Sequence, residues 1–273
     1  MSSNCGEKTI MLDYDIPKNH PRYESLVTRE KIIQGMHNKI VAEAGLIAHG
    51  RGEAFDYLLG EESPTFALKQ EKLAVITLLL AKKPIISVNG NVAALCAKEI
   101  VELSKFLNAP LEINLFYRTQ ERINAIEEVM RKSGAEVLLG IDPNHQETIP
   151  ELSHQRRIVD SRGIAHSDCV FVPLEDGDRT MVLRKLGKSV VTVDLNPLSR
   201  TSLAASVSII NNITRAATEM VGFTKKFQGS SVQELEREKK QLDNKNLLQE
   251  AMKFMSTRLV ELANNRKTFE VNI

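Results

Sequence analysis

Short apolar runs rich in β-branched residues recur along the chain, and each is followed by a stretch with helical periodicity. Runs that are apolar on both faces are typical of strands buried within a parallel sheet. Strands are expected over 85–88, 111–116, 137–141, 169–173, 190–193 and 207–210. Helices are expected over 21–41, 65–82, 92–107, 119–133, 175–187 and 214–227. The alternation predicts an α/β, Rossmann-like fold with a mainly parallel sheet flanked by helices.

Changes in this pattern divide the chain into three parts. Residues 1–15 show no period and are expected to be a flexible N-terminal extension. Residues 16–230 are expected to form the α/β domain, whose N-terminal part is helical. Residues 231–273 are expected to form a C-terminal helical segment, one long helix or a helix pair, with Ser231 and Glu234 suited to a capping box.

The C-terminal segment carries an apolar stripe that runs from Leu235 to Leu262. Such a stripe either packs on its own domain or forms a contact between subunits. Residues 146–167 show no clear period and are rich in charge, with Arg156, Arg157, Asp160, Arg162 and His166 among them. This segment is interpreted either as a solvated surface loop or as a lid over the site.

Composition and charge describe an ordinary globular protein. Hydrophobic residues make up 42% and charged residues 26% of the chain, and the net charge of +1 argues against nucleic-acid binding. No apolar run approaches the ~20 residues of a membrane span, and the polar N-terminus does not resemble a signal peptide. The three cysteines have no paired spacing, which fits a reducing cytosol. We therefore expect a soluble cytoplasmic protein.

Polar side chains follow strand after strand of the predicted sheet. Asn89 and Asn91 follow one strand, and Asn211 and Asn212 follow another. Ligands of open α/β sheets bind beyond the carboxyl ends of the strands, so these residues are expected to mark the site. The segment 190–201 is the richest, because its strand leads to a carboxylate, a carboxamide, two hydroxyls and a guanidinium. The alternative interpretation is that all of these are ordinary turn residues.

In a second informative stretch, Arg51 lies between Gly50 and Gly52, and His49 precedes the first of these glycines. We expect a glycine loop here, with the free amides of a helix that starts at Glu53 forming an anion site. The spacing is not that of a P-loop, and no strand is followed by a G-x-G-x-x-G turn.

Several blocks taken together resemble the archaeal phosphopantothenate synthetases, also called 4-phosphopantoate–β-alanine ligases. The blocks occur in the family's order and extend over roughly residues 16–227, while the C-terminal helices match only in character. They are residues 16–23, 29–33, 44–58, 86–95, 111–119, 172–180 and 190–200.

The resemblance implies an ATP-dependent ligase of coenzyme A synthesis that joins 4-phosphopantoate to β-alanine through an acyl adenylate and releases AMP and pyrophosphate. It implies a homodimer, and Mg²⁺ as the counter-ion of the triphosphate, although the sequence identifies no metal ligands. Arg51 and His49 are the candidate catalytic residues. Candidates for binding the phosphorylated substrate are His49, Asn89, Asn91 and Arg118. The residues implied to bind ATP are Arg29, Arg51, Asp194, Leu195, Asn196, Arg200, Thr201, Asn212 and Ile213.

Two other functions compete with the ligase. A nicotinamide- or flavin-dependent oxidoreductase fits a Rossmann-like sheet, but the glycine fingerprint is missing. A non-catalytic dimer that senses nucleotides is also compatible, since a fold and ATP binding do not prove chemistry.

Overall fold

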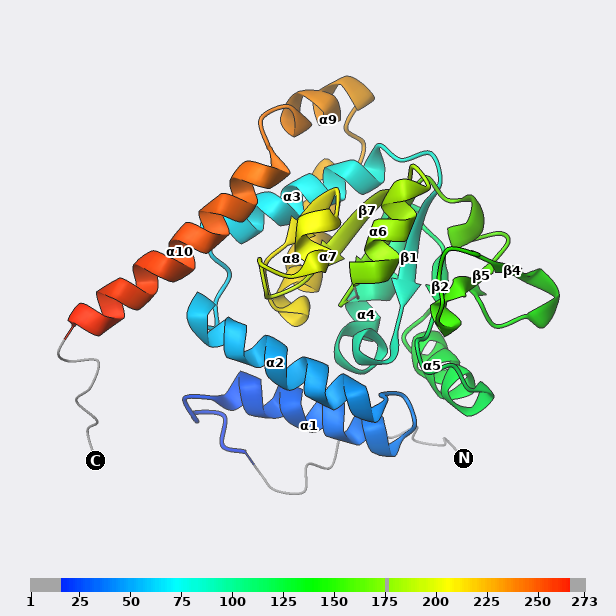
Figure 1. The fold of residues 1–273 in the computed structure, drawn as a ribbon, viewed down its shortest axis with the longest axis horizontal. Helices are drawn as coiled ribbons and strands as arrows, with labels where there is room; N and C mark the ends of the chain where they lie inside the picture. Colours follow the sequence, from blue (N-terminus) through cyan, green and yellow to red (C-terminus); the bar gives the residue numbers. More distant parts are fainter. Residues whose placement is uncertain (1–15, 175–176, 266–273) are drawn as a thin grey trace, which may run out of the picture.

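A computed structural model describes residues 16–174 and 177–265 of the chain, and in them a six-stranded sheet forms the centre (Figure 1). All neighbouring strands are parallel, in the order β3-β2-β1-β6-β7-β8, which confirms the predicted fold class. The order reverses between β1 and β6, so the crevice between the loops after these two strands is a topological switch point. The strands are β1 (Pro84–Val88), β2 (Leu111–Ile113), β3 (Leu138–Leu139), β6 (Cys169–Pro173), β7 (Ser189–Val193) and β8 (Val207–Ile209).

Helices cover both faces of the sheet because its strands are apolar on both. In β6, Cys169 and Phe171 point into the larger core, and Val170 and Val172 point into the smaller one. Helices α3, α4, α5 and α8 close the larger core, and α6 lies over the smaller one (Figure 1). The helices are α1 (Tyr23–His37), α2 (Glu43–Leu59), α3 (Thr65–Leu79), α4 (Gly90–Leu107), α5 (Gln120–Lys132), α6 (Gly177–Lys185), α7 (Arg200–Ala204), α8 (Ile213–Phe227), α9 (Val232–Lys239) and α10 (Asn244–Asn264).

Helix α2 replaces the expected glycine loop, so that prediction was wrong. The helix runs from Glu43 to Leu59 without a break through Gly45, Gly50 and Gly52. Glycine costs about 1 kcal/mol in a helix relative to alanine, an amount that tertiary contacts can override. At Gly45 a side chain would not fit, since a Cβ would lie 2.4 Å from Oδ1 of Asn91. The amides from Glu53 onward belong to the middle of α2 and offer no free anion site.

Residues 146–167 form a hairpin and short 3₁₀ turns, and they do not form a solvated loop. Strand β4 (Gln146–Thr148) pairs antiparallel with β5 (Ile158–Asp160). Ile149, Leu152 and Ile164 are buried against the smaller core. The segment lacks a clear period because its short pieces bury isolated side chains and present no continuous face.

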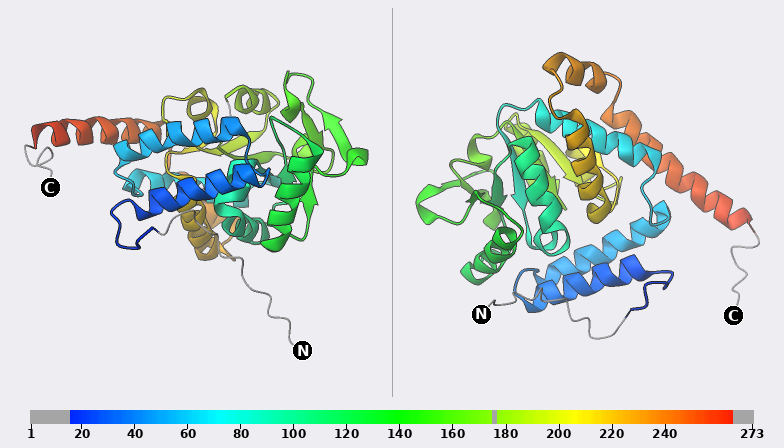
Figure 2. Two further views of the ribbon diagram at one scale, coloured as in Figure 1. Left: turned by 90° about the horizontal axis from the view of Figure 1, so that it is seen from below. Right: turned by 180° about the vertical axis from the view of Figure 1, so that it is seen from behind.

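The C-terminal segment is a helix pair, and its predicted capping box is present between Ser231 and Glu234. The apolar stripe is buried within the subunit as far as Met255, and both Leu235 and Met255 belong to the larger core. Helix α10 then extends beyond the body of the molecule, where Leu259 and Val260 are exposed (Figures 1 and 2).

Three expectations concern segments that the structure leaves wholly or partly undescribed. The flexible extension over 1–15 lies outside the described residues, as do the first two residues of the helix expected from 175 and the last eight of the C-terminal segment. Within the described residues, no helix is both long and apolar enough to cross a membrane.

Candidate active site

A cavity of about 590 Å³ lies at the carboxyl ends of the strands, between the loops that follow them and helix α2. The loops after β1, β2, β6 and β7 supply four parts of its lining, and the start of α8 supplies a fifth. Helix α2 closes the cavity from the side away from the sheet, with α1 packed beside it (Figure 1).

The loop after β7 is held by its own polar side chains. Asp194 accepts hydrogen bonds from the backbone N–H of Asn196 at 2.9 Å and from Oγ of Ser199 at 2.5 Å. Ser199 also caps helix α7 by accepting from the N–H of Ser202. Burial raises the pKa of Asp194, while these hydrogen bonds and the charge of Arg51 oppose the shift. The carboxylate therefore keeps the loop in shape next to the cavity.

Arg200 supplies a cation where α7 begins. Its Nη1 lies 2.9 Å from Oδ1 of Asp178 on α6, and both side chains are largely exposed. A Cβ on Gly177 would lie 2.6 Å from the Cβ of Arg200, so only glycine allows the two helix starts to come this close. The close approach places Gly177, Arg200 and Thr201 together on one wall.

Two asparagines after β1 fasten the walls of the cavity to each other. Asn89 caps α4 through Val92 and donates from Nδ2 to the carbonyl oxygens of Pro173 and Leu174, at the end of β6 across the switch point. Asn91 donates to the carbonyl oxygen of Gly45 at 2.9 Å and so ties α4 to α2. Both side chains therefore shape the site by bonding to the protein.

The wall made by α2 presents a histidine, a cation and a carboxylate, His49, Arg51 and Glu53, from little more than one helical turn. His49 is half-buried, and its burial lowers its pKa, which outweighs the opposing effects of Glu53 and Asp56. Arg51 is exposed at the cavity and contributes an attractive charge to Asp194 on the facing loop. Glu53 accepts from Arg22 at 2.9 Å, which joins α2 to the segment before α1.

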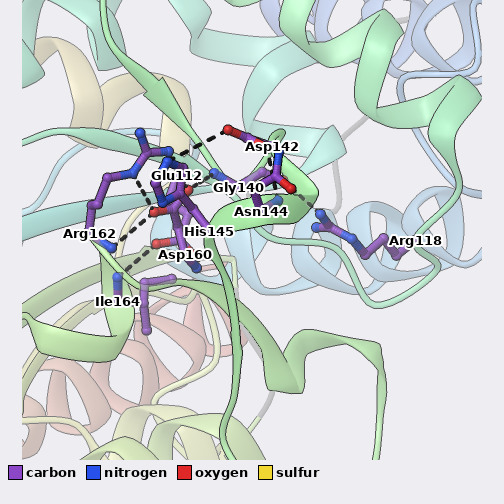
Figure 3. Close-up of polar contacts among 9 residues, drawn as sticks. All are labelled: Glu112, Arg118, Gly140, Asp142, Asn144, His145, Asp160, Arg162 and Ile164. Atoms are coloured by element: carbon purple, nitrogen blue, oxygen red, sulfur yellow. Dashed lines mark hydrogen bonds and ion pairs between the residues drawn. The ribbon is translucent and has the colours of Figure 1, made fainter.

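Most of the residues chosen from the sequence meet in this one cavity, but two of them do not line it. Arg29 lies on α1, where it is 3.5 Å from Glu30. Arg118 donates to the carbonyl oxygen of Gly140 at 2.7 Å, beside the cluster drawn in Figure 3. Those that line the cavity are His49, Arg51, Asn89, Asn91, Asp194, Leu195, Asn196, Arg200, Thr201, Asn212 and Ile213.

Two further arginines line the cavity at the end formed by the loop after β2. Arg122 donates to the carbonyl oxygens of Tyr117 at 2.5 Å and Ile40 at 2.9 Å. Arg156 comes from the hairpin and is only 9% exposed. A helical arginine such as Arg122 gives no sequence signal, whereas Arg156 belongs to the segment interpreted as a possible lid.

A buried acidic cluster holds the hairpin that carries Arg156 (Figure 3). Glu112 on β2 accepts from the N–H of Asp160 at 3.0 Å and of Ile164 at 2.7 Å. Burial raises the pKa of Glu112 to about 7, against these hydrogen bonds. Asp160 accepts from the N–H of Gly140 and pairs with Arg162, and these bonds lower its pKa to about 2 despite its burial.

Fold and site together define a Rossmann-like α/β protein with a cation-lined cavity at the switch point of its sheet, the usual location of a nucleotide site in this class. Residues 66–258 match the model of the phosphopantothenate/pantothenate synthetase family. The chain belongs to that family, which confirms the resemblance deduced from the sequence blocks.

Curated relatives agree with this assignment. A protein of Thermococcus kodakarensis is 52% identical over 250 residues, which cover 91% of this chain and 95% of the relative. A protein of Thermococcus onnurineus is 52% identical with the same coverage, and one of Methanosarcina mazei is 49% identical over 91% of this chain and 97% of its own. All three are named 4-phosphopantoate–beta-alanine ligase.

Proposed function

We propose that the protein is an ATP-dependent ligase of coenzyme A synthesis that condenses 4-phosphopantoate with β-alanine to 4′-phosphopantothenate and releases AMP and pyrophosphate. The observation that carries the proposal is the meeting of eleven expected residues in one cavity at the switch point. Relatives that match nearly the whole chain and bear the ligase name support it.

The chemistry has two balanced steps. A carboxylate oxygen of 4-phosphopantoate attacks the α-phosphorus of ATP, and the bond from that phosphorus to pyrophosphate breaks. The amine of β-alanine then attacks the carbonyl carbon of the acyl adenylate. The bond to AMP breaks, and the amine loses a proton. The enzyme needs no covalent nucleophile, because it acts by holding reactants in line and offsetting negative charge.

Arg51 and Arg200 are the cations suited to the triphosphate, because they reach the cavity from two different walls. Guanidinium groups bind phosphate oxygens in two-pronged fashion and keep their charge at any working pH. Leu195 and Ile213 add apolar surface, and Thr201 adds a hydroxyl, on the side formed by β7 and α8. We assign ATP to this side of the cavity.

We assign the phosphorylated acid to the end lined by Tyr117, Arg122 and Arg156. These two arginines replace Arg118 as candidates for its phosphate, because Arg118 lies outside the lining. His49, whose pKa is lowered by burial, is largely neutral at neutral pH and can accept the proton that the amine releases. Asn89 and Asn91 then act mainly by fixing the walls.

The charge of Mg²⁺ suits the triphosphate, and the side chains that would hold such an ion are carboxylates of the cavity lining. Within residues 16–174 and 177–265, no three His, Cys, Asp or Glu side chains form a metal-binding group. Mg²⁺ commonly uses one or two carboxylates together with substrate phosphates. Glu53 and Asp194 are carboxylates of the lining. The ion would offset charge on the leaving pyrophosphate.

The products and the path of one oxygen atom test the proposal. The protein is incubated with ATP, β-alanine and 4-phosphopantoate whose carboxylate carries ¹⁸O, and each substrate is omitted in turn as a control. We expect AMP and pyrophosphate only with the acid present, with one ¹⁸O transferred to AMP. Formation of ADP and orthophosphate would contradict the adenylate and indicate an acyl phosphate intermediate. ATP binding without any product would favour the nucleotide sensor, and turnover of a nicotinamide or flavin would favour the oxidoreductase.

A further inference from the structure

Helix α2 carries His49 and Arg51 but is held to the protein by few buried groups. Only Asp56 and Leu59 of its 17 residues are buried. A carboxylate that is 5% exposed must be paired with donors, because an unpaired buried charge is strongly unfavourable. Together with the contacts of Asn91 and Glu53 described above, the partners of Asp56 therefore fix where this wall of the cavity lies.

The partners of Asp56 come from the start of α8, which lines the side of the cavity that we assign to ATP. Oδ2 accepts from Nδ2 of Asn212 at 2.9 Å and from Nη1 of Arg215 at 3.2 Å. Oδ1 accepts from Nη2 of Arg215 at 2.5 Å. The two-pronged pair with Arg215 fixes the direction of the carboxylate as well as its distance.

Both polar atoms of the Asn212 side chain already form hydrogen bonds within the protein. Its Oδ1 caps α8 by accepting from the N–H and the hydroxyl of Thr214, and its Nδ2 donates to Asp56. What Asn212 and Ile213 offer to a ligand is therefore their position at the start of a helix, where first-turn N–H groups lack acceptors within the helix. That position depends on Asp56.

The far side of the network is anchored in the core. Nε of Arg215 donates to Oδ1 of Asn211 at 3.1 Å, and Nδ2 of Asn211 donates to Oε1 of Glu71 at 2.9 Å. Burial, followed by the neighbouring Glu219, raises the pKa of Glu71 to about 10, so Glu71 is uncharged at neutral pH. The chain of contacts thus runs from α3 through α8 to α2, and its ion pair joins the buried Asp56 to the partly exposed Arg215.

We propose that Asp56 is a positioning residue that sets the distance between Arg51 on α2 and the start of α8 across the nucleotide side of the cavity. The inference rests on the proposed function. Asp56 lies outside the lining of the cavity, and it acts through Asn212 and through the helix that carries Arg51. Displacing a reacting group by ~1 Å can cost about 10²-fold in rate, so a small shift of α2 is enough to matter.

The first test is Asp56→Asn, which keeps the shape and removes the charge. We expect kcat/KM for ATP to fall by about 10²-fold, while KM for β-alanine changes by less than about threefold. Asp56→Glu, which retains the carboxylate, should recover part of the loss. Hydrogen exchange should speed up in residues 43–59 and stay unchanged in α4. Asp168→Asn is the matched control, because Asp168 holds the backbone of Lys82 and Lys83 at the other end of β1.

A second variant separates positioning from stability. Asp56→Asn leaves the charge of Arg215, whose side chain is 25% exposed, without its ion-pair partner, and this lowers the stability of the protein. Asp56→Asn combined with Arg215→Gln removes both charges and should regain most of the melting temperature while kcat/KM for ATP stays at least tenfold low.

If the wild type is an active ligase, a near-normal kcat/KM for ATP in Asp56→Asn or in the double variant would overturn the proposed role of Asp56 and leave the proposed function standing. A wild type that forms no phosphopantothenate would instead refute the proposed function.

Discussion

A Cβ on Gly90 would lie 2.1 Å from the carbonyl oxygen of Ile40, so the start of α4 touches the connection between α1 and α2 with no room for a side chain. Nη2 of Arg122 donates to the same carbonyl oxygen at 2.9 Å. Glycine is thus required at position 90 by a contact with a segment 50 residues earlier in the chain. Gly90 lines the cavity, and Ile40 adjoins it.

Gly90→Ala should therefore destabilise the protein, because a backbone oxygen cannot move aside as a flexible side chain can. We expect a loss of about 1–3 kcal/mol in the free energy of unfolding, measured in urea. Gly222→Ala is the matched control, since a Cβ there meets nothing within 4 Å on α8. It should stabilise by up to ~1 kcal/mol, as alanine favours a helix over glycine. Equal effects of the two changes would contradict the steric argument.

Arg51→Ala should lower kcat/KM for ATP by about 10²- to 10³-fold. The guanidinium faces the cavity, and one charge-assisted contact to a developing charge is worth ~2–4 kcal/mol. Arg51→Lys should restore only part, because a point charge cannot make a two-pronged contact. The melting temperature should hardly change, since Arg51 is exposed. Arg131→Ala, which removes an exposed partner of Glu127 on α5, should leave the kinetics unaltered.

Glu71→Gln should change how stability depends on pH. The pKa of Glu71 is raised from 4.5 to about 10 in the folded protein. Its favourable contribution is therefore complete below pH 4.5 and is lost as the pH rises toward about 10. Gln mimics the protonated acid, so the stability advantage of the variant over wild type should grow by about 3 kcal/mol from pH 6 to pH 8. Urea unfolding at both pH values measures the gain, and a difference that is the same at both would show that Glu71 is ionised.

The homodimer implied by the family resemblance remains a prediction, and the exposed end of α10 is where we expect its contact. Leu259 and Val260 are 49% and 58% exposed. Light scattering should report twice the 30.5 kDa of one chain at micromolar concentration. Leu259→Glu with Val260→Glu should give single chains, because burying two carboxylates in an apolar contact is unfavourable. A wild-type mass of one chain would refute the dimer, and a dimer that survives the double variant would move the interface elsewhere.

The sequence by itself determined the sheet and the edge at which the site lies. The six strands were predicted because a central parallel strand must be apolar on both faces, which leaves an uninterrupted β-branched run such as 190–193. The parallel arrangement then brings the residues after every strand to one edge, so Asp194 and Asn212 could be grouped without coordinates. The capping box at Ser231 was also predictable, because its partners are three residues apart.

Only the tertiary structure decided what those side chains do and where α2 lies. Gly50 and Gly52 suggested a loop, but residues 43–59 form one unbroken helix, whose Asp56 is held by Asn212 and Arg215. The role of Asp56 depends on Arg215, a partner 159 residues away, and local pattern carries no information about such pairs. The cavity position of Arg122 likewise follows from the packing of α5 beside the carbonyl oxygens that it binds. Periodicity specifies which face of an element is buried, whereas the identity of the group that meets it is set by the fold.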